Sequence, residues 1–109
     1  MAEEALIAFC TIPDVEIARR IAKEIVDLRL AACANILPNV HSIYHWHGKT
    51  ETADEVLTIF KLTARSYAEF ETKLRSLHPY DVPEIIAYRI EQGLPEYLRW
   101  VLDSCRLTP

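Results

Sequence analysis

Glycine is scarce in this chain, with only two residues among 109. Loops that hold phosphate groups, and the Gly-x-Ser-x-Gly turn that carries a nucleophilic serine, need glycines at closer and defined spacings. Neither motif occurs in the sequence. We therefore predict no catalytic residues and do not expect an enzyme.

Blocks of like charge and long apolar runs are also missing. The formal net charge is −4, from 12 basic and 16 acidic residues that are interspersed along the chain. Without a basic stripe, we expect no nucleic-acid partner. No apolar run approaches the roughly 20 residues of a membrane-spanning helix, so we expect no membrane partner. The first residues are acidic where a signal peptide would be basic, which argues against export.

Cysteines are few, and their number is odd. Cys10, Cys33 and Cys105 are far apart, and no Cys-x-x-Cys pair occurs. A disulfide framework would need an even and denser set, so we predict reduced thiols and a cytoplasmic location. Cys33 and Cys105 are interpreted as packing residues, with Cys33 buried on a strand.

Half of the residues are hydrophobic, which is typical of an ordered globular chain. The length suits a single domain over residues 1–109. Residues 32–62 predict two long strands that are joined by a turn at residues 48–50, where Gly48 can adopt a positive φ. On the first strand, side chains alternate between two faces. One face carries Ser42, Tyr44 and Trp46, and the other carries His41, Ile43, His45 and His47. A hairpin this long would extend beyond a small domain and must be covered.

The remaining segments alternate between strand and helix patterns. We predict strands over residues 6–11 and 85–90, and we expect the first of them to be buried on both faces. A first helix should begin after Asp14. A second helix should begin near Thr63 or Ser66 and end before His78-Pro79, and a last helix should span residues 96–104. Strand, helix, strand, strand, helix, strand is the order of the ferredoxin-like, or split βαβ, α+β sandwich. Its antiparallel sheet would have the strand order 4-1-3-2.

The predicted strands are apolar on both faces, although two helices can cover only one face of the sheet. The residues concerned are Ile7, Phe9, Ile43, Leu57, Ile59, Ile86 and Tyr88. Their uncovered side would exceed the apolar patch that a monomer usually exposes. Association into a closed ring of subunits is the expected remedy.

Five short motifs, in order, carry a family resemblance. They are Phe9-Cys10-Thr11, the run from Leu30 to Pro38, Ser42-x-Tyr44-x-Trp46-x-Gly48, His78-Pro79-Tyr80-x-x-Pro83-Glu84-Ile85 and Gly93-x-x-x-Tyr97-Leu98-x-Trp100. Across nearly its full length the chain resembles the divalent-cation tolerance proteins, the CutA family. The resemblance implies a homotrimer of ferredoxin-like subunits that is similar to the PII signalling proteins. It also implies a role in cytoplasmic tolerance of copper and other divalent metals.

A metal site is predicted where the first strand ends beside the beginning of the last strand. This neighbourhood brings Cys10 close to the loop that carries His78 and Glu84, and a thiolate with an imidazole suits copper or zinc. The resemblance implies a second histidine before His78, but Leu77 occupies that position. The alternative is that Cys10 packs as a small apolar residue and His78 caps a helix. His41, His45 and His47 are a second candidate, in which His45 and His47 place two imidazoles on one strand face; the alternative is a solvated outer face of the hairpin.

The other candidate is a cleft or interface between subunits. Tyr44 and Trp46 would stack on a ligand or anchor a neighbouring subunit. The cleft would also include Lys61, Pro83, Glu84 and Trp100. We therefore expect a homotrimer that binds copper or other divalent ions through Cys10, His78 and Glu84, with no organic cofactor. The alternative is a PII-like signalling or scaffold trimer that binds a small organic ligand or a partner protein in its clefts.

Overall fold

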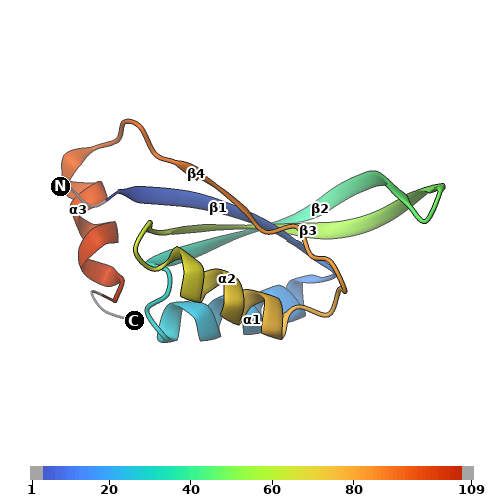
Figure 1. Cartoon of the computed structure of the whole chain (residues 1–109), viewed down its shortest axis with the longest axis horizontal. Coiled ribbons are helices and arrows are strands. Elements are labelled where there is room, and N and C mark those ends of the chain that lie inside the picture. The colour runs from blue at the N-terminus through green and yellow to red at the C-terminus, as the bar shows by residue number, and fades with distance from the viewer. Residues whose placement is uncertain (1–3, 107–109) are drawn as a thin grey trace.

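The computed structural model describes residues 4–106, which form one antiparallel sheet and three helices. The elements follow the order β1 (Ala5–Ile12), α1 (Val15–Asp27), β2 (Cys33–Trp46), β3 (Lys49–Thr63), α2 (Tyr67–Leu77), β4 (Ile86–Arg89) and α3 (Pro95–Ser104). The four strands are arranged β2-β3-β1-β4, which confirms the predicted ferredoxin-like topology. Helices α1 and α2 lie together beneath the sheet, and α3 lies at one end of it (Figure 1).

The core lies between the sheet and the two helices beneath it. On β1, Ala8, Cys10 and Ile12 are fully buried, whereas the alternate residues are only half-buried. Phe60 of β3 meets Phe70 of α2 edge-to-face, with ring centroids 5.0 Å apart. Successive side chains of a strand point to opposite faces, so the helices seal one face alone. The prediction that β1 is buried on both faces is therefore wrong for the single subunit.

The helix ends follow local chemistry. Asp14 caps α1, because its carboxylate accepts a hydrogen bond from the Ile17 amide at 2.9 Å. The side chain of Ser66 makes no capping bond at the start of α2; instead, the Thr63 hydroxyl accepts from the Ser66 amide at 3.2 Å. Helix α2 ends at Leu77, where the approach of Pro79 forces His78 into an extended conformation.

Strands β2 and β3 continue beyond the sheet as a two-stranded arm. The pairing of β1 with β3 ends at Ile12 and Val56, whereas β2 and β3 remain paired as far as Trp46 and Lys49. The arm projects away from the helices and lengthens the molecule to 45 Å (Figure 1). We define this arm as residues 40–55.

The arm reverses one residue earlier than predicted. The two central turn residues are His47 and Gly48, with φ of 51° and 77°. A positive φ at both positions matches the twist of the flanking strands, which explains the use of a two-residue loop. Nearer the body, a register shift between Leu37 and Val40 accommodates Pro38, which an edge strand tolerates.

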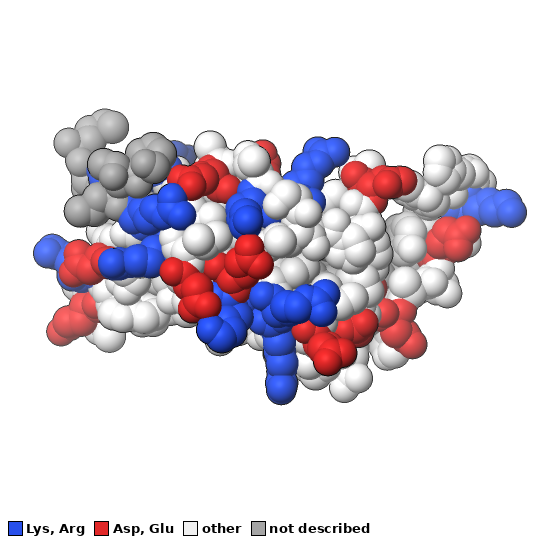
Figure 2. Space-filling view, turned by 90° about the horizontal axis from the view of Figure 1, so that it is seen from below, with Lys and Arg blue, Asp and Glu red and all other residues white. Residues whose placement is uncertain are grey.

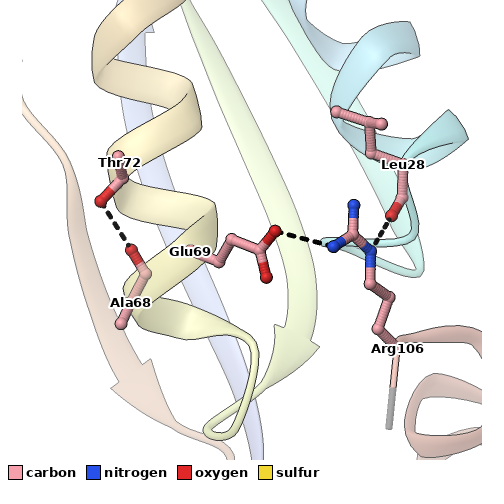
Figure 3. A network of polar contacts seen from close by, with 5 residues as sticks. All are labelled: Leu28, Ala68, Glu69, Thr72 and Arg106. Atoms are coloured by element: carbon pink, nitrogen blue, oxygen red, sulfur yellow. Dashed lines mark hydrogen bonds and ion pairs between the residues drawn. The ribbon is translucent and has the colours of Figure 1, made fainter. Parts of the chain in front are cut away.

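The end of α3 is tied to the other two helices by Arg106. Its guanidinium donates to the Glu69 carboxylate on α2 and to the Leu28 carbonyl after α1, both at 2.7 Å (Figure 3). Cys105, one residue earlier, is buried, which agrees with its interpretation as a packing residue. Cys33 is instead half-buried, with its sulfur 3.6 Å from the Tyr97 hydroxyl, so the prediction of a buried Cys33 is wrong.

Neither α1 nor α2 lies over the opposite face of the sheet, and within residues 4–106 α3 approaches that face only at one end of the sheet, where Tyr97 meets Cys33 (Figure 1). Register places Ile7, Phe9, Leu57, Ile59, Ile86 and Tyr88 on this face. Tyr88 and Ile86 are 61% and 45% exposed. We call this surface the open face. Its residues are the apolar set that the sequence pattern predicted to lack cover, except Ile43, which lies on the other side of the arm.

The helix side of the molecule is polar. Acidic and basic side chains are intermixed there, without a field of one sign (Figure 2). This mixture is typical of a solvated surface.

Candidate functional site

A pocket of about 650 Å³ opens where the arm leaves the body. One side comes from the arm and the end of β1, and the other comes from the loop between α2 and β4. The described lining residues are Thr11, Ser42, Ile43, Tyr44, Trp46, Glu55, Pro79, Tyr80, Asp81, Val82 and Glu84. Three of them are carboxylates, and no lysine, arginine or histidine is among them. The pocket therefore has a negative lining with aromatic walls.

Glu55 is the most enclosed of the three carboxylates. It lies on β3 just beyond the end of β1 and is 7% exposed. The Tyr80 hydroxyl donates to its Oε2 at 2.7 Å. Burial, followed by this hydrogen bond and the negative charge of Glu55, raises the pKa of Tyr80. Tyr80 therefore remains a neutral O–H donor across the physiological range.

His78 anchors the loop that forms the second wall. It is 7% exposed; its Nε2 lies 2.7 Å from the Thr11 carbonyl, and its Nδ1 lies 3.1 Å from the Tyr80 amide. Since a carbonyl can only accept and an amide N–H can only donate, the ring carries its proton on Nε2. Both ring nitrogens are therefore engaged within the fold.

Cys10 lies behind this pocket rather than in it. Its side chain is on the helix-covered face and is fully buried. Burial, and then the charges of Glu84 and Glu55, raise the pKa of this thiol from 9.0 to about 12. The two carboxylates are thus within electrostatic range of Cys10, and of the two only Glu84 belongs to the predicted metal site. The sulfur is nevertheless protonated at neutral pH, and a thiol is a far poorer metal ligand than a thiolate.

The predicted metal residues do not converge on one point. Among the described residues, no group of three histidine, cysteine, aspartate or glutamate side chains is arranged to hold a metal ion. In this conformation Cys10, His78 and Glu84 therefore lie in the same region of the molecule, but they do not form a coordination sphere for a metal ion.

The predicted cleft residues divide into two groups. Tyr44, Trp46 and Glu84 line the pocket together. Lys61 lies elsewhere, opposite Ile7 on the open face, where its ammonium donates to the Asn35 side chain. Pro83 adjoins the pocket through Glu84 but does not line it.

Trp100 also lies away from the pocket, on α3. Its ring centroid is 5.5 Å from that of Tyr97, and the residue is 45% exposed. Tyr97 in turn approaches Cys33 of β2. The last helix therefore presents its own aromatic surface, separate from the pocket.

The arm histidines make no shared site in the described chain. His41 lies 2.8 Å from Asp54 across the arm, and both side chains are more than three-quarters exposed. His45 faces Thr50, whereas His47 occupies the turn. This placement agrees with the interpretation of a solvated face.

Sequence reasoning missed Glu55, Tyr80 and Asp81 as pocket residues. A signal for Glu55 was present, because this acid directly precedes the apolar run Val56-Leu57 on a central strand. A carboxylate at such a position is unusual unless it has a function or a partner. The sequence could not show that Tyr80 reaches across to it.

A second hollow, of about 770 Å³, lies between β4 and α3. Its acidic Glu4 already faces Arg89, with a nitrogen–oxygen separation of 3.8 Å. The charges of this hollow are therefore at least partly balanced, unlike those of the pocket at the base of the arm.

The fold and this pocket define a class: a ferredoxin-like α+β protein with a long arm and a negative pocket at the base of that arm. Residues 6–104 match the family model described as CutA1 divalent ion tolerance protein. The chain belongs to this family.

Individual relatives agree with this membership. The chain is 42% identical to the divalent-cation tolerance protein CutA of Thermus thermophilus, over 90% of this chain and 95% of the relative. It is 46% identical to protein CutA of Mus musculus over 86% of its own length, but it spans only 53% of that longer relative. The solved structure of CutA1 from Oryza sativa superimposes with a TM-score of 0.93 at 36% identity, covering 96% of each chain.

The compartment stays a prediction. No helix among residues 4–106 is long and apolar enough to cross a membrane. A solved relative from Archaeoglobus fulgidus, 38% identical with a TM-score of 0.88 over 92% of this chain and 97% of that chain, is described as a periplasmic divalent cation tolerance protein.

Proposed function

We propose that the protein acts in divalent-cation tolerance as a cytoplasmic homotrimer that binds metal cations weakly at the base of each arm. The observation that carries the proposal is the pocket with three carboxylates and no basic side chain among its described lining residues. A negative lining concentrates cations and disfavours anions. Homologues named for divalent-cation tolerance support the choice of a metal as cargo.

The open face supports the trimer. Phe9, Ile59, Ile86 and Tyr88 form an apolar surface that the helices of the same subunit leave uncovered. Exposure of such an apolar surface to water is unfavourable, and association with another protein surface removes that exposure. A closed ring uses every copy of the open face and leaves no free end, which limits further association. The arm would reach the neighbouring subunit and cover part of that surface.

Glu84, Cys10 and His78 are the proposed metal ligands. Glu84 is exposed at the pocket, whereas Cys10 must lose its proton and His78 must release Thr11 or Tyr80 before either can bind a metal. These requirements lower the affinity. Because the metal competes with the proton on the thiol, the affinity should rise with pH.

Calorimetric titration of copper(II) tests this site. Copper(II) binding to wild type should release heat, and binding to the Cys10→Ala and Glu84→Gln variants should release less. Glu16→Gln, which removes the same charge on the exposed first turn of α1, should behave like wild type. Equal heats in wild type, Cys10→Ala and Glu84→Gln would remove this site.

The second candidate is a PII-like signalling or scaffold trimer that holds a small organic ligand in its clefts. Its specific support is the pocket volume of about 650 Å³, which lies within the range of small-molecule sites and far exceeds a bare ion. Tyr44 and Trp46 supply aromatic walls. Mass spectrometry of natively purified protein, with and without Trp46→Leu, would test for a retained organic molecule.

A further inference from the structure

We propose that the pocket at the base of the arm binds an organic cation, with an ammonium or guanidinium group attached to a flat apolar body. The proposal names the ligand class of the second candidate function and rests on that function. Its support comes from four features of the pocket: charge, carboxylate spacing, aromatic walls and a fixed acceptor.

The first feature is the sign of the charge. Glu55, Asp81 and Glu84 line the pocket, and no basic residue among the described lining residues neutralises them. An anionic ligand such as a nucleotide would meet repulsion there. A cationic ligand gains electrostatic attraction, which is stronger beside a partly buried carboxylate than in bulk water.

The second feature is the spacing of these carboxylates. Together with the other described side chains they make no set of three that could surround a metal ion. Separated carboxylates can instead accept hydrogen bonds from different N–H groups of one larger cation. The pocket carboxylates therefore suit an ammonium or guanidinium group, whereas the metal proposed above would be held by Glu84 together with Cys10 and His78, two residues that do not line the pocket.

The third feature is the aromatic wall. Tyr44 and Trp46 come from one face of the arm, and Tyr80 comes from the opposing loop. Tyr44 and Tyr80 are 43% and 37% exposed, so their rings have surface left for a ligand, whereas we expect Trp46 to contact a neighbouring subunit as well. Flat apolar groups stack on such rings, and cations are attracted to their faces.

The fourth feature is the fixed position of Glu55. This carboxylate is 93% enclosed, and the Tyr80 hydroxyl holds one of its oxygens at 2.7 Å. The phenol is neutral, so it orients the carboxylate without cancelling its charge. A charged group this enclosed is stabilised by a cationic partner, and a ligand would supply one.

A series of three indoles tests the charge requirement on the full chain as it assembles. Tryptamine is cationic at neutral pH, tryptophol replaces its ammonium by a hydroxyl, and indole-3-propionate is anionic. Calorimetry should show tryptamine binding about tenfold or more tightly than tryptophol, as expected for a charge-assisted hydrogen bond. Indole-3-propionate should bind most weakly.

Variants then assign the binding to the pocket. Because the Glu84 side chain is exposed, the Glu84→Gln variant should fold normally. The Glu55→Gln variant keeps an acceptor for the Tyr80 hydroxyl. Each variant should bind tryptamine about tenfold more weakly than wild type and should bind tryptophol with nearly unchanged affinity. Glu16→Gln on α1 removes the same charge outside the pocket and should change neither. If circular dichroism shows that Glu55→Gln is misfolded, Glu84→Gln alone decides the test.

Three results would overturn the proposal: no tryptamine binding at millimolar concentration, equal affinity for tryptamine and tryptophol, or an equal loss in Glu16→Gln and Glu84→Gln. Copper titration of the same proteins separates this inference from the metal proposal. The Cys10→Ala variant should release less heat than wild type when copper is titrated into it, and it should still bind tryptamine. Copper binding without tryptamine binding would refute the organic cation alone, and the reverse result would refute the metal site alone.

Discussion

The two faces of the sheet are built by the same strands but have different surroundings. On the helix-covered face, Cys10, Phe60 and Leu62 are completely buried. On the open face, Tyr88 is 61% exposed and Phe9 is only half-buried. The same strands therefore supply the core of the subunit on one side and an apolar surface on the other.

This difference separates two contributions to stability. Side chains on the helix-covered face lose their contact with water when the subunit folds, so they stabilise the subunit itself. Side chains on the open face gain the same benefit only when a second surface covers them. Substitutions on the two faces should therefore affect different equilibria.

The largest expected effect is the loss of assembly in Trp46→Asp. An aromatic anchor at a subunit interface contributes roughly 2 kcal/mol or more, and the proposed ring of three subunits would repeat the change at each contact. Multi-angle light scattering at micromolar concentration should show trimer for wild type and smaller or misfolded species for the variant. His45→Asp lies on the other face of the arm and should remain assembled. An intact Trp46→Asp trimer of unchanged heat stability would exclude an interfacial role for this residue.

Phe60→Ala should reduce subunit stability by about 3–5 kcal/mol, because it removes a fully buried ring that packs on Phe70. Urea denaturation at constant protein concentration measures the change. Phe9→Ala, on the open face, provides the comparison: it should weaken assembly more than it weakens the subunit. If both substitutions altered only subunit stability, the proposed separation of the two faces would be wrong.

The Cys10 thiol should produce a stability loss at alkaline pH. Folding raises its pKa from 9.0 to about 12, so the folded state favours the neutral thiol. Its contribution is complete below pH 9 and should decrease by about 1.4 kcal/mol per pH unit as the pH rises toward 12. Denaturation of wild type and Cys10→Ala between pH 7 and 11 should show a difference that changes only above pH 9. A constant difference would contradict the burial of this thiol.

The smallest effect on the free energy of unfolding is expected at the beginning of α1, where Asp14 caps the helix. Asp14→Ala removes the side chain that accepts from the Ile17 amide and should cost about 1 kcal/mol. Asp14→Asn keeps an acceptor oxygen and should cost much less. Thermal unfolding of the two variants provides the comparison, and equal losses would mean that the cap hydrogen bond is not the cause.

Much of the fold could be predicted because its signals are local. The alternation of Tyr44 and Trp46 with their neighbours indicated the arm, and Asp14 and Pro79 marked helix ends. The reversal was misplaced by one residue, since His47 adopts the positive φ that the sequence pattern favours for glycine. The site was only partly predictable, because pocket residues come from separate segments and Glu55 meets Tyr80 only in the folded chain.

The sequence by itself determined the strand and helix order, the apolar surplus of the strands and the family membership, because these depend on periodicity and on short motifs along the chain. Only the tertiary structure decided that Cys10 faces the core, that both nitrogens of His78 are engaged, and that Lys61 lies outside the pocket. The physical reason is that burial and hydrogen bonding are set by neighbours distant in sequence. The availability of a side chain for a ligand depends on those neighbours as much as on its own chemistry.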